Sequence, residues 1–188
     1  LKAKGVSSDK LRILDLCTGS GCIAWTMAME CPGAEVVAVD ISDGALRTAS
    51  TQNFAGEMNI TGAKAPRFVK ADVLNSAELL VDAGSFDIIL SNPPYVMDSE
   101  KSLMRANVLD HEPHLALFVP DDDALKFYKP VADIAFRLLS PSGFGIVEIN
   151  EALGQETAAV FIDAGFSDVS VLKDLSDKDR FVMFSGHK

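Results

Sequence analysis

Residues 13–21 read Ile13-Leu14-Asp15-Leu16-Cys17-Thr18-Gly19-Ser20-Gly21, an apolar run that leads directly into a glycine-rich turn. Near-continuous hydrophobicity over the length of a strand is typical of a parallel strand that is buried on both faces. The two glycines let the backbone approach a ligand closely, and a helix beginning at Gly21 would offer its free N–H groups at the same place. Strand, glycine turn and helix in succession predict an α/β fold with a ligand at the end of this strand.

The same alternation of apolar runs and helical periodicity continues along the chain. Strands are predicted at Leu11–Leu16, Glu35–Asp40, Arg67–Ala71, Phe86–Ser91, Phe144–Asn150, Ser167–Leu172 and Arg180–Ser185. Helices are predicted at Gly21–Glu30, Asp43–Met58, Ala77–Val81, Ala124–Leu139 and Ala152–Ala164. Pro130 should kink or restart the fourth of these helices. Only Lys173–Asp179 separates the last two strands, so they should pair antiparallel. The pattern predicts a Rossmann-like, doubly wound and mostly parallel sheet of seven strands that ends in an antiparallel hairpin.

Length and composition restrict the class of protein. The 188 residues form a single expected domain, 1–188, and no apolar run approaches the ~20 residues of a membrane span. No signal peptide opens the sequence, and the three cysteines lack paired C-x2-C spacing, which predicts reduced thiols in the cytoplasm. The net charge of −10, with no basic cluster, argues against nucleic acid as a partner.

Four successive predicted strands have a polar residue at or next to their end, namely Asp15, Asp40, Asp72 and Asn92. Open α/β sheets bind ligands outside the carboxyl ends of their strands. Asp40 is placed to accept hydrogen bonds from ribose hydroxyls, and Asp72-Val73 could accept from an adenine amino group and pack on the ring. The plain alternatives are a simple turn at Gly19 and Gly21, a helix cap at Asp40 and an ordinary solvent-exposed strand end at Asp72. One nucleoside-containing cofactor explains all four strand ends together.

The fourth strand runs into Asn92-Pro93-Pro94-Tyr95. Proline fixes its own φ, lacks an N–H and pushes the preceding residue toward extended geometry. The Asn92 side-chain oxygen and the Pro93 carbonyl are therefore held stiffly as acceptors, an amide clamp that suits a substrate –NH2 group. The alternative is a rigid turn that ends the strand. The long connection that follows, Tyr95–Asp122, is predicted to be a lid over the same crevice.

The identity of the cofactor has two possible answers at this point. Gly19-x-Gly21-x-x-Ala24 with Asp40 satisfies the dinucleotide fingerprint, which leaves a nicotinamide-dependent oxidoreductase open. S-adenosylmethionine explains more of the sequence, because its methyl sulfonium would then point toward Asn92. Its predicted contacts are Asp15, Cys17, Thr18, Gly19, Gly21, Asp40, Ile41, Asp72, Val73 and Asn92. No metal site is expected, since the two histidines of His111-Glu112-Pro113-His114 do not share a helical face.

In these motifs and their order the chain resembles the release-factor glutamine methyltransferases of the HemK/PrmC type, which belong to the class I S-adenosylmethionine-dependent methyltransferases. The similar stretches are Ile13–Ala24, Val39–Ser42, Phe86–Tyr95, Glu112-Pro113, Ala116-Leu117, Asp121–Asp123, Tyr128, Glu148-Ile149, Gln155, Asp174-Leu175 and Asp179-Arg180. The resemblance implies N5-methylation of the glutamine in the Gly-Gly-Gln loop of peptide chain release factors. It also implies a catalytic role for Asn92, Pro93, Pro94 and Tyr95, with Glu112 joining Asn92, Pro93 and Tyr95 in binding the substrate.

Two departures from that family stand out. Cys17 occupies the position of the first glycine of the loop, where we expect φ below zero. The N-terminal helical domain of the family is not seen in this sequence, which therefore reads as a catalytic domain. The Asn-Pro-Pro-Tyr motif is shared with amino methyltransferases of adenine N6 in DNA and guanine N2 in RNA, so a nucleic-acid methyltransferase stays open. A non-catalytic module that only binds S-adenosylmethionine is the remaining alternative.

Overall fold

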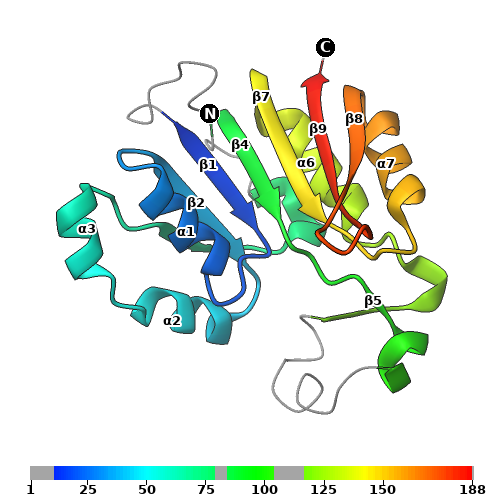
Figure 1. Cartoon of the computed structure of the whole chain (residues 1–188), viewed down its shortest axis with the longest axis horizontal. Helices are drawn as coiled ribbons and strands as arrows, with labels where there is room; N and C mark the ends of the chain where they lie inside the picture. The colour runs from blue at the N-terminus through cyan, green and yellow to red at the C-terminus, as the bar shows by residue number, and fades with distance from the viewer. Residues whose placement is uncertain (1–10, 79–83, 104–116, 188) are drawn as a thin grey trace.

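Seven strands form one twisted sheet in the order β3-β2-β1-β4-β7-β9-β8 (Figure 1). The structure is a computed structural model, and it describes residues 11–78, 84–103 and 117–187. The strands are β1 (Arg12–Leu16), β2 (Glu35–Asp40), β3 (Arg67–Lys70), β4 (Phe86–Ser91), β7 (Leu139–Glu148), β8 (Phe166–Lys173) and β9 (Asp179–His187). The pairings among β1, β2, β3, β4 and β7 are parallel, whereas β9 lies antiparallel to both β7 and β8. The predicted sheet and its terminal hairpin are confirmed.

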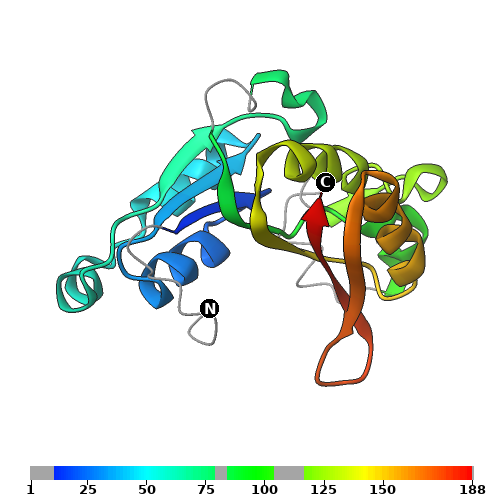
Figure 2. The ribbon, with the colours of Figure 1, turned by 90° about the horizontal axis from the view of Figure 1, so that it is seen from above.

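Helices cover the sheet on both faces because alternate strand residues point in opposite directions. On one face, Ile13, Val36 and Ile88 pack with Ala24 and Ala28 of α1. On the other face, strand residues pack against α6 and α7; these include Leu14, Leu16, Val37, Val39 and Ile89. Figure 2 shows α1 and α6 on opposite sides of the sheet. The helix bounds are α1 (Cys22–Glu30), α2 (Asp43–Thr51), α3 (Ala55–Thr61), α6 (Tyr128–Leu138) and α7 (Gly154–Asp163).

The terminal hairpin is packed by aromatic rings. Phe184 of β9 stacks on Phe161 of α7, with ring centroids 4.3 Å apart, and both side chains are fully buried. The Phe184 ring lies directly over Gly145 of β7, where an added Cβ would overlap it. A strand glycine is thus required by the close approach of a neighbouring ring.

Several predicted helix boundaries are wrong, and a local hydrogen bond together with an aromatic contact explains the largest difference. The helix predicted over Asp43–Met58 is two helices separated at Gln52–Phe54. Asn53 Oδ1 accepts from the Ala55 N–H at 3.1 Å, which offers the backbone an alternative to the helix. Phe54 lies between the two helices, and its ring packs on Trp25 with 4.9 Å between the ring centroids. Trp25 is a buried core residue.

The other boundary differences are smaller. The predicted helix Ala124–Leu139 begins only at Tyr128, so Pro130 lies in the first turn and marks a start rather than a kink. The predicted Ala77–Val81 overlaps the 3₁₀ helix η3 (Val73–Glu78), and its remainder lies outside the described residues. β7 begins at Leu139, five residues earlier than predicted, because Leu139 already pairs with Phe86 across a bulge.

The predicted lid contains short regular elements. β5 (Val96–Met97) and β6 (Phe118–Val119) pair as a separate parallel ribbon, accompanied by the 3₁₀ helices η4 (Asp98–Leu103) and η5 (Asp121–Asp123). Residues 104–116 lie outside the described part of the chain. Within the described residues, no helix has the length and apolar character needed to cross a bilayer.

Candidate functional site

The ends of five strands form a row along the carboxyl edge of the sheet (Figure 1). Register places Leu16 beside Val39 on one side and Ser91 on the other, and Ser91 beside Val147. The residues that follow these positions therefore lie in the order Asp40, Cys17, Asn92 and Glu148. The glycine turn after β1 and the Asn-Pro-Pro-Tyr stretch after β4 flank the point where the strand order reverses. Doubly wound sheets bind ligands at this switch point.

Backbone hydrogen bonds fix the shape of the glycine turn. The Thr18 N–H donates to the Val39 carbonyl at 2.9 Å, and the Gly19 N–H donates to Asp40 Oδ2 at 2.8 Å. Cys17 has φ of 60°, so the expectation of φ below zero is wrong. The turn needs the left-handed conformation at this position, and a residue with a Cβ adopts it at a cost of about 1 kcal/mol.

The two glycines of the turn serve different physical needs. Gly19 has φ of 56°, and a Cβ built there would meet nothing within 4 Å, so the space beside it is open. Gly21 has φ of 83°, and a Cβ there would come within 2.9 Å of the Ala49 Cβ and 3.2 Å of the Trp25 ring. Gly19 therefore leaves room on the ligand side, whereas Gly21 lets α1 pack closely on its neighbours.

Asp15 lies beneath the turn. Its side chain is 1% exposed, and the Thr18 hydroxyl donates to Oδ2 at 2.5 Å, while Oδ1 has no hydrogen-bond partner among the described residues. Burial raises the pKa of Asp15 to about 7, more than the Thr18 hydrogen bond lowers it. Direct contact with a cofactor stays a prediction, and support of the turn through Thr18 is the role that this geometry favours.

The next two strand ends present half-buried carboxylates. Asp40 Oδ1 accepts from the Ser42 N–H at 2.8 Å, so both Asp40 oxygens are oriented by backbone donors and each keeps further accepting capacity. Ile41 beside it is 46% exposed. Asp72 Oδ1 accepts from the Leu74 N–H at 2.9 Å, and Val73 is buried. The structure thus brings the predicted ribose and adenine residues to one edge.

The amide clamp combines an exposed amide with buried prolines. Asn92 is exposed, whereas Pro93 and Pro94 are buried. Ser91, just before them, donates its hydroxyl to the Leu16 carbonyl at 2.8 Å and thereby ties the end of β4 to the end of β1. Among the described residues, no hydrogen bond occupies the Asn92 side chain, so its oxygen is free to accept from a ligand.

Tyr95 is held by the end of β7. Its hydroxyl donates to Glu148 Oε1 at 2.7 Å, and its carbonyl accepts from Asn150 Nδ2 at 3.3 Å. Burial, followed by the hydrogen bond to Glu148, raises the pKa of the Tyr95 phenol to about 12. Tyr128 adds a hydrogen bond from its hydroxyl to the Glu148 carbonyl at 3.2 Å.

Glu148 and Asn150 were not among the residues assigned to the site from the sequence. The available signal is that they close the fifth parallel strand, just as Asp15, Asp40 and Asn92 close others. Glu112 and its flanking histidines, His111 and His114, lie outside the described residues. Over the described ranges, no group of three His, Cys, Asp or Glu side chains is close enough to hold a metal ion.

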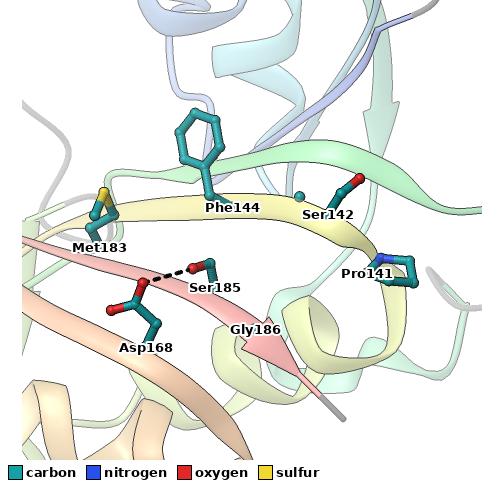
Figure 3. Close-up of a pocket in the computed structure, with 8 residues that line it drawn as sticks. Pro141, Ser142, Phe144, Asp168, Met183, Ser185 and Gly186 are labelled. Carbon is teal, nitrogen blue, oxygen red and sulfur yellow. Dashed lines mark hydrogen bonds between the residues drawn. The ribbon is translucent and has the colours of Figure 1, made fainter. Parts of the chain in front are cut away.

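A hollow of about 410 Å³ lies at the opposite edge of the sheet (Figure 3). Its lining includes Pro141 and Phe144 near the start of β7 and Ser185 near the end of β9, and Ser185 donates to Asp168 Oδ2 at 3.4 Å. None of the strand-end residues lines it, so it is separate from the candidate site.

Comparison with known proteins adds to this geometry. Residues 3–116 match the family model described as "Methyltransferase small domain". The chain is 43% identical over 176 residues to the "Release factor glutamine methyltransferase" of Flavobacterium psychrophilum, covering 94% of this chain and 59% of the relative. It is 44% identical over 174 residues to the protein of the same name from Bacteroides thetaiotaomicron, covering 93% and 60%. The chain thus spans about three fifths of the length of these relatives.

Solved structures are similar in fold. TrmN from Thermus thermophilus has a TM-score of 0.58 at 20% identity, covering 96% of this chain and 46% of that one. A TehB-like SAM-dependent methyltransferase from Corynebacterium glutamicum has a TM-score of 0.57 at 14% identity, covering 98% and 84%. The fold is that of the class I S-adenosylmethionine-dependent methyltransferases.

Proposed function

Because the chain belongs to the methyltransferase small-domain family, we propose that it transfers a methyl group from S-adenosylmethionine to a glutamine of peptide chain release factors. The acceptor is the side-chain N5 of the glutamine in the Gly-Gly-Gln loop. The observation that carries the proposal is the exposed Asn92 amide, free of partners among the described residues and beside the glycine turn. Relatives that bear the name release factor glutamine methyltransferase support the choice of substrate.

The strand-end residues fit the cofactor. The open space at Gly19 and the N-terminus of α1 suit its amino-acid end, Asp40 and Ile41 suit the ribose, and Asp72 with Val73 suits the adenine. Asp40 is already oriented by two backbone N–H groups, so it accepts from the ribose without further ordering. When bound, S-adenosylmethionine supplies an electrophilic methyl group.

The clamp acts on the acceptor nitrogen. An amide nitrogen is a poor nucleophile because its lone pair is delocalised into the carbonyl. It loses that delocalisation and gains positive charge as the N–C bond forms and the bond between the methyl carbon and the sulfur breaks, and its proton then passes to solvent water. The Asn92 oxygen and the Pro93 carbonyl, both accepting from the –NH2, strengthen their hydrogen bonds as the charge develops. Fixed dipoles that bind the transition state better than the ground state accelerate the reaction without a strong base.

The setting of the reaction follows from the substrate. Release factors act in translation, so we place the chain in the cytoplasm with a protein partner and without a nucleic-acid substrate, in keeping with its net charge of −10. Residues 1–188 act as the catalytic domain. Tyr95 flanks the planar amide of the glutamine, and Glu112 contributes to binding the substrate.

Parallel incubations test the proposal. The chain, and a longer form with the full length of its relatives, are incubated with labelled S-adenosylmethionine and either a release factor or a nucleic acid (DNA or RNA). Binding of NAD(H) is measured in a separate incubation. We expect label only on the release factor. Label on nucleic acid would instead identify an amino methyltransferase of bases. Cofactor binding with no transfer by either form would identify a sensing module, and binding of NAD(H) instead would identify an oxidoreductase.

A further inference from the structure

The hydroxyl and the main-chain carbonyl of Tyr95 are both held by residues at the end of β7. The hydroxyl donates to Glu148 Oε1 at 2.7 Å, and the main-chain carbonyl accepts from Asn150 Nδ2 at 3.3 Å. The two contacts lie at opposite ends of the residue, so together they restrict its rotation as well as its position. Tyr95 is the last residue of the Asn92-Pro93-Pro94-Tyr95 stretch that forms the amide clamp. These hydrogen bonds therefore fix the C-terminal end of that stretch.

Asn150 connects three segments. It is 5% exposed, and its second Nδ2 hydrogen goes to Glu100 Oε2 of η4 at 2.8 Å, while its Oδ1 accepts from the Ala152 N–H at 2.9 Å. Glu100 Oε2 also accepts from the Met97 N–H at 2.8 Å. One buried amide thus links Tyr95 to η4 and to the segment that leads into α7.

Glu148 is itself fixed from two directions. As part of β7 it pairs with Phe181 of β9, and its carbonyl accepts from the Tyr128 hydroxyl at 3.2 Å. Arg180, next to Phe181, lies near Glu148 and Tyr95 and is anchored by Asp174 at 3.2 Å and Glu151 at 3.6 Å. The carboxylate that receives the Tyr95 hydroxyl therefore sits on rigid elements, as precise positioning requires.

We propose that Glu148 and Asn150 are positioning residues that hold Tyr95 and, through it, set the geometry of the amide clamp. The inference rests on the proposed function, since it assigns these residues a part in the same reaction. Pro93 and Pro94 have fixed φ angles, so a displacement of Tyr95 passes along the stiff segment to the Pro93 carbonyl and Asn92. A misplacement of about 1 Å at a reacting group can cost ~10²-fold in rate.

Variants of Glu148 test the first contact. We expect Glu148→Ala to lower kcat about 10-fold, with the affinity for S-adenosylmethionine unchanged, because a hydrogen bond to a charged group is lost. Glu148→Gln keeps an acceptor for the hydroxyl and should retain most of the activity. Glu156→Ala is the matched control, since it removes an exposed carboxylate of α7 for which the described residues show no contact with Tyr95 or Arg180. An Ala variant as active as this control, or a Gln variant as impaired as Ala, would overturn the proposal.

A double-mutant cycle tests whether Glu148 acts through Tyr95. Tyr95→Phe removes the same hydrogen bond from the other side, so the double variant with Glu148→Ala should be no slower than the worse single variant. Losses that multiply would show that Glu148 acts elsewhere. Thermal melts of all variants separate these effects from loss of folding.

Hydrogen exchange provides a readout that does not depend on activity. We expect the amides of Val96 and Met97 to exchange faster in Glu148→Ala, and in Asn150→Ala if that variant folds, than in the chain itself or in Glu156→Ala. Unchanged exchange in both Glu148→Ala and a folded Asn150→Ala would overturn the positioning role. Should the unaltered chain methylate no release factor, the proposed function fails, and hydrogen exchange still decides whether Glu148 positions Tyr95.

Discussion

Asn92 and its proline neighbours have opposite environments, although they are adjacent in the chain. Pro93 and Pro94 are buried and immobilise the backbone, while the Asn92 amide is exposed at the edge of the sheet. An oxyanion hole stabilises developing negative charge with fixed hydrogen-bond donors. Here the buried prolines fix an exposed hydrogen-bond acceptor, the Asn92 oxygen, which stabilises the positive charge that develops on the substrate nitrogen. At the scale of the residue, rigidity and accessibility are thus supplied by different side chains.

Removal of the Asn92 amide should separate chemistry from cofactor binding. We expect Asn92→Ala to lose about 10²–10³ in turnover, the usual effect of removing one preorganised dipole. Its affinity for S-adenosylmethionine, measured by calorimetry, should stay close to that of the unaltered chain. Asn59→Ala on the exposed surface of α3 is the control. Unchanged turnover in Asn92→Ala would exclude the clamp mechanism.

Asp40 should affect the affinity for S-adenosylmethionine, whereas Asn92 should affect turnover. Asp40→Ala removes the predicted ribose acceptor and also the carboxylate that holds the Gly19 N–H, so it should weaken binding of S-adenosylmethionine. Isothermal calorimetry measures the effect directly. Asp43→Ala, which removes an exposed carboxylate that pairs with Lys70 at 2.6 Å, should leave the affinity unchanged. Equal affinities in the two variants would refute the ribose assignment.

Asp15 predicts how stability depends on pH. Its pKa is raised from 3.8 to about 7 by burial, so between these values the folded chain binds more protons than the unfolded chain. The protonated Asp15 carboxyl therefore contributes up to about 4 kcal/mol to the free energy of unfolding. This contribution is fully present below pH ~4 and is lost as the pH rises through ~7. Urea unfolding at pH 5 and pH 8 should show a smaller difference for Asp15→Asn than for the unaltered chain. Equal differences would show that Asp15 is not the group responsible.

At the scale of the element, the packing of the hairpin β8–β9 depends on a glycine in the neighbouring strand β7. Gly145 leaves space for the Phe184 ring, which stacks on Phe161. The hairpin also brings Arg180 to the carboxyl edge, near Tyr95 and Glu148. Packing of β9 against β7 therefore contributes both to the core and to the setting of the site.

Filling the space at Gly145 should destabilise the fold. We expect Gly145→Ala to cost about 1–3 kcal/mol of unfolding free energy, since the Phe184 ring must move from its stacked position. Gly56→Ala in α3 is the control, because an added Cβ there meets nothing within 4 Å and the change should be neutral or slightly stabilising. Denaturant unfolding compares the two, and equal stabilities would contradict the packing argument.

At the scale of the whole molecule, the hydrophobic pattern was sufficient to predict the sheet. The seven strands and the hairpin follow from uninterrupted apolar runs and one short connection, which are local properties of the sequence. The break between α2 and α3 depends on Phe54 meeting Trp25, a contact between residues distant in sequence. The left-handed Cys17 depends on the hydrogen bonds of the turn, and periodicity does not report such bonds.

The residues of the candidate site also fall into two groups, those that the sequence predicts and those that only the structure reveals. Residues that a strand end delivers, such as Asp40 and Asn92, were found because the end of a strand can be read from the sequence. The roles of Glu148 and Asn150 depend on the register between β4 and β7, which places them beside Tyr95. Register is a property of the assembled sheet, so their contacts could be seen only in the structure.

The most direct measurement is mass spectrometry of a release factor after incubation with the chain and S-adenosylmethionine. We predict the addition of one methyl group, mapped by fragmentation to the side-chain nitrogen of the glutamine in the Gly-Gly-Gln loop, and an addition about 10²–10³ times slower with Asn92→Ala. A release factor that stays unmodified while the chain binds the cofactor, or a methyl group on any other residue, would contradict the account.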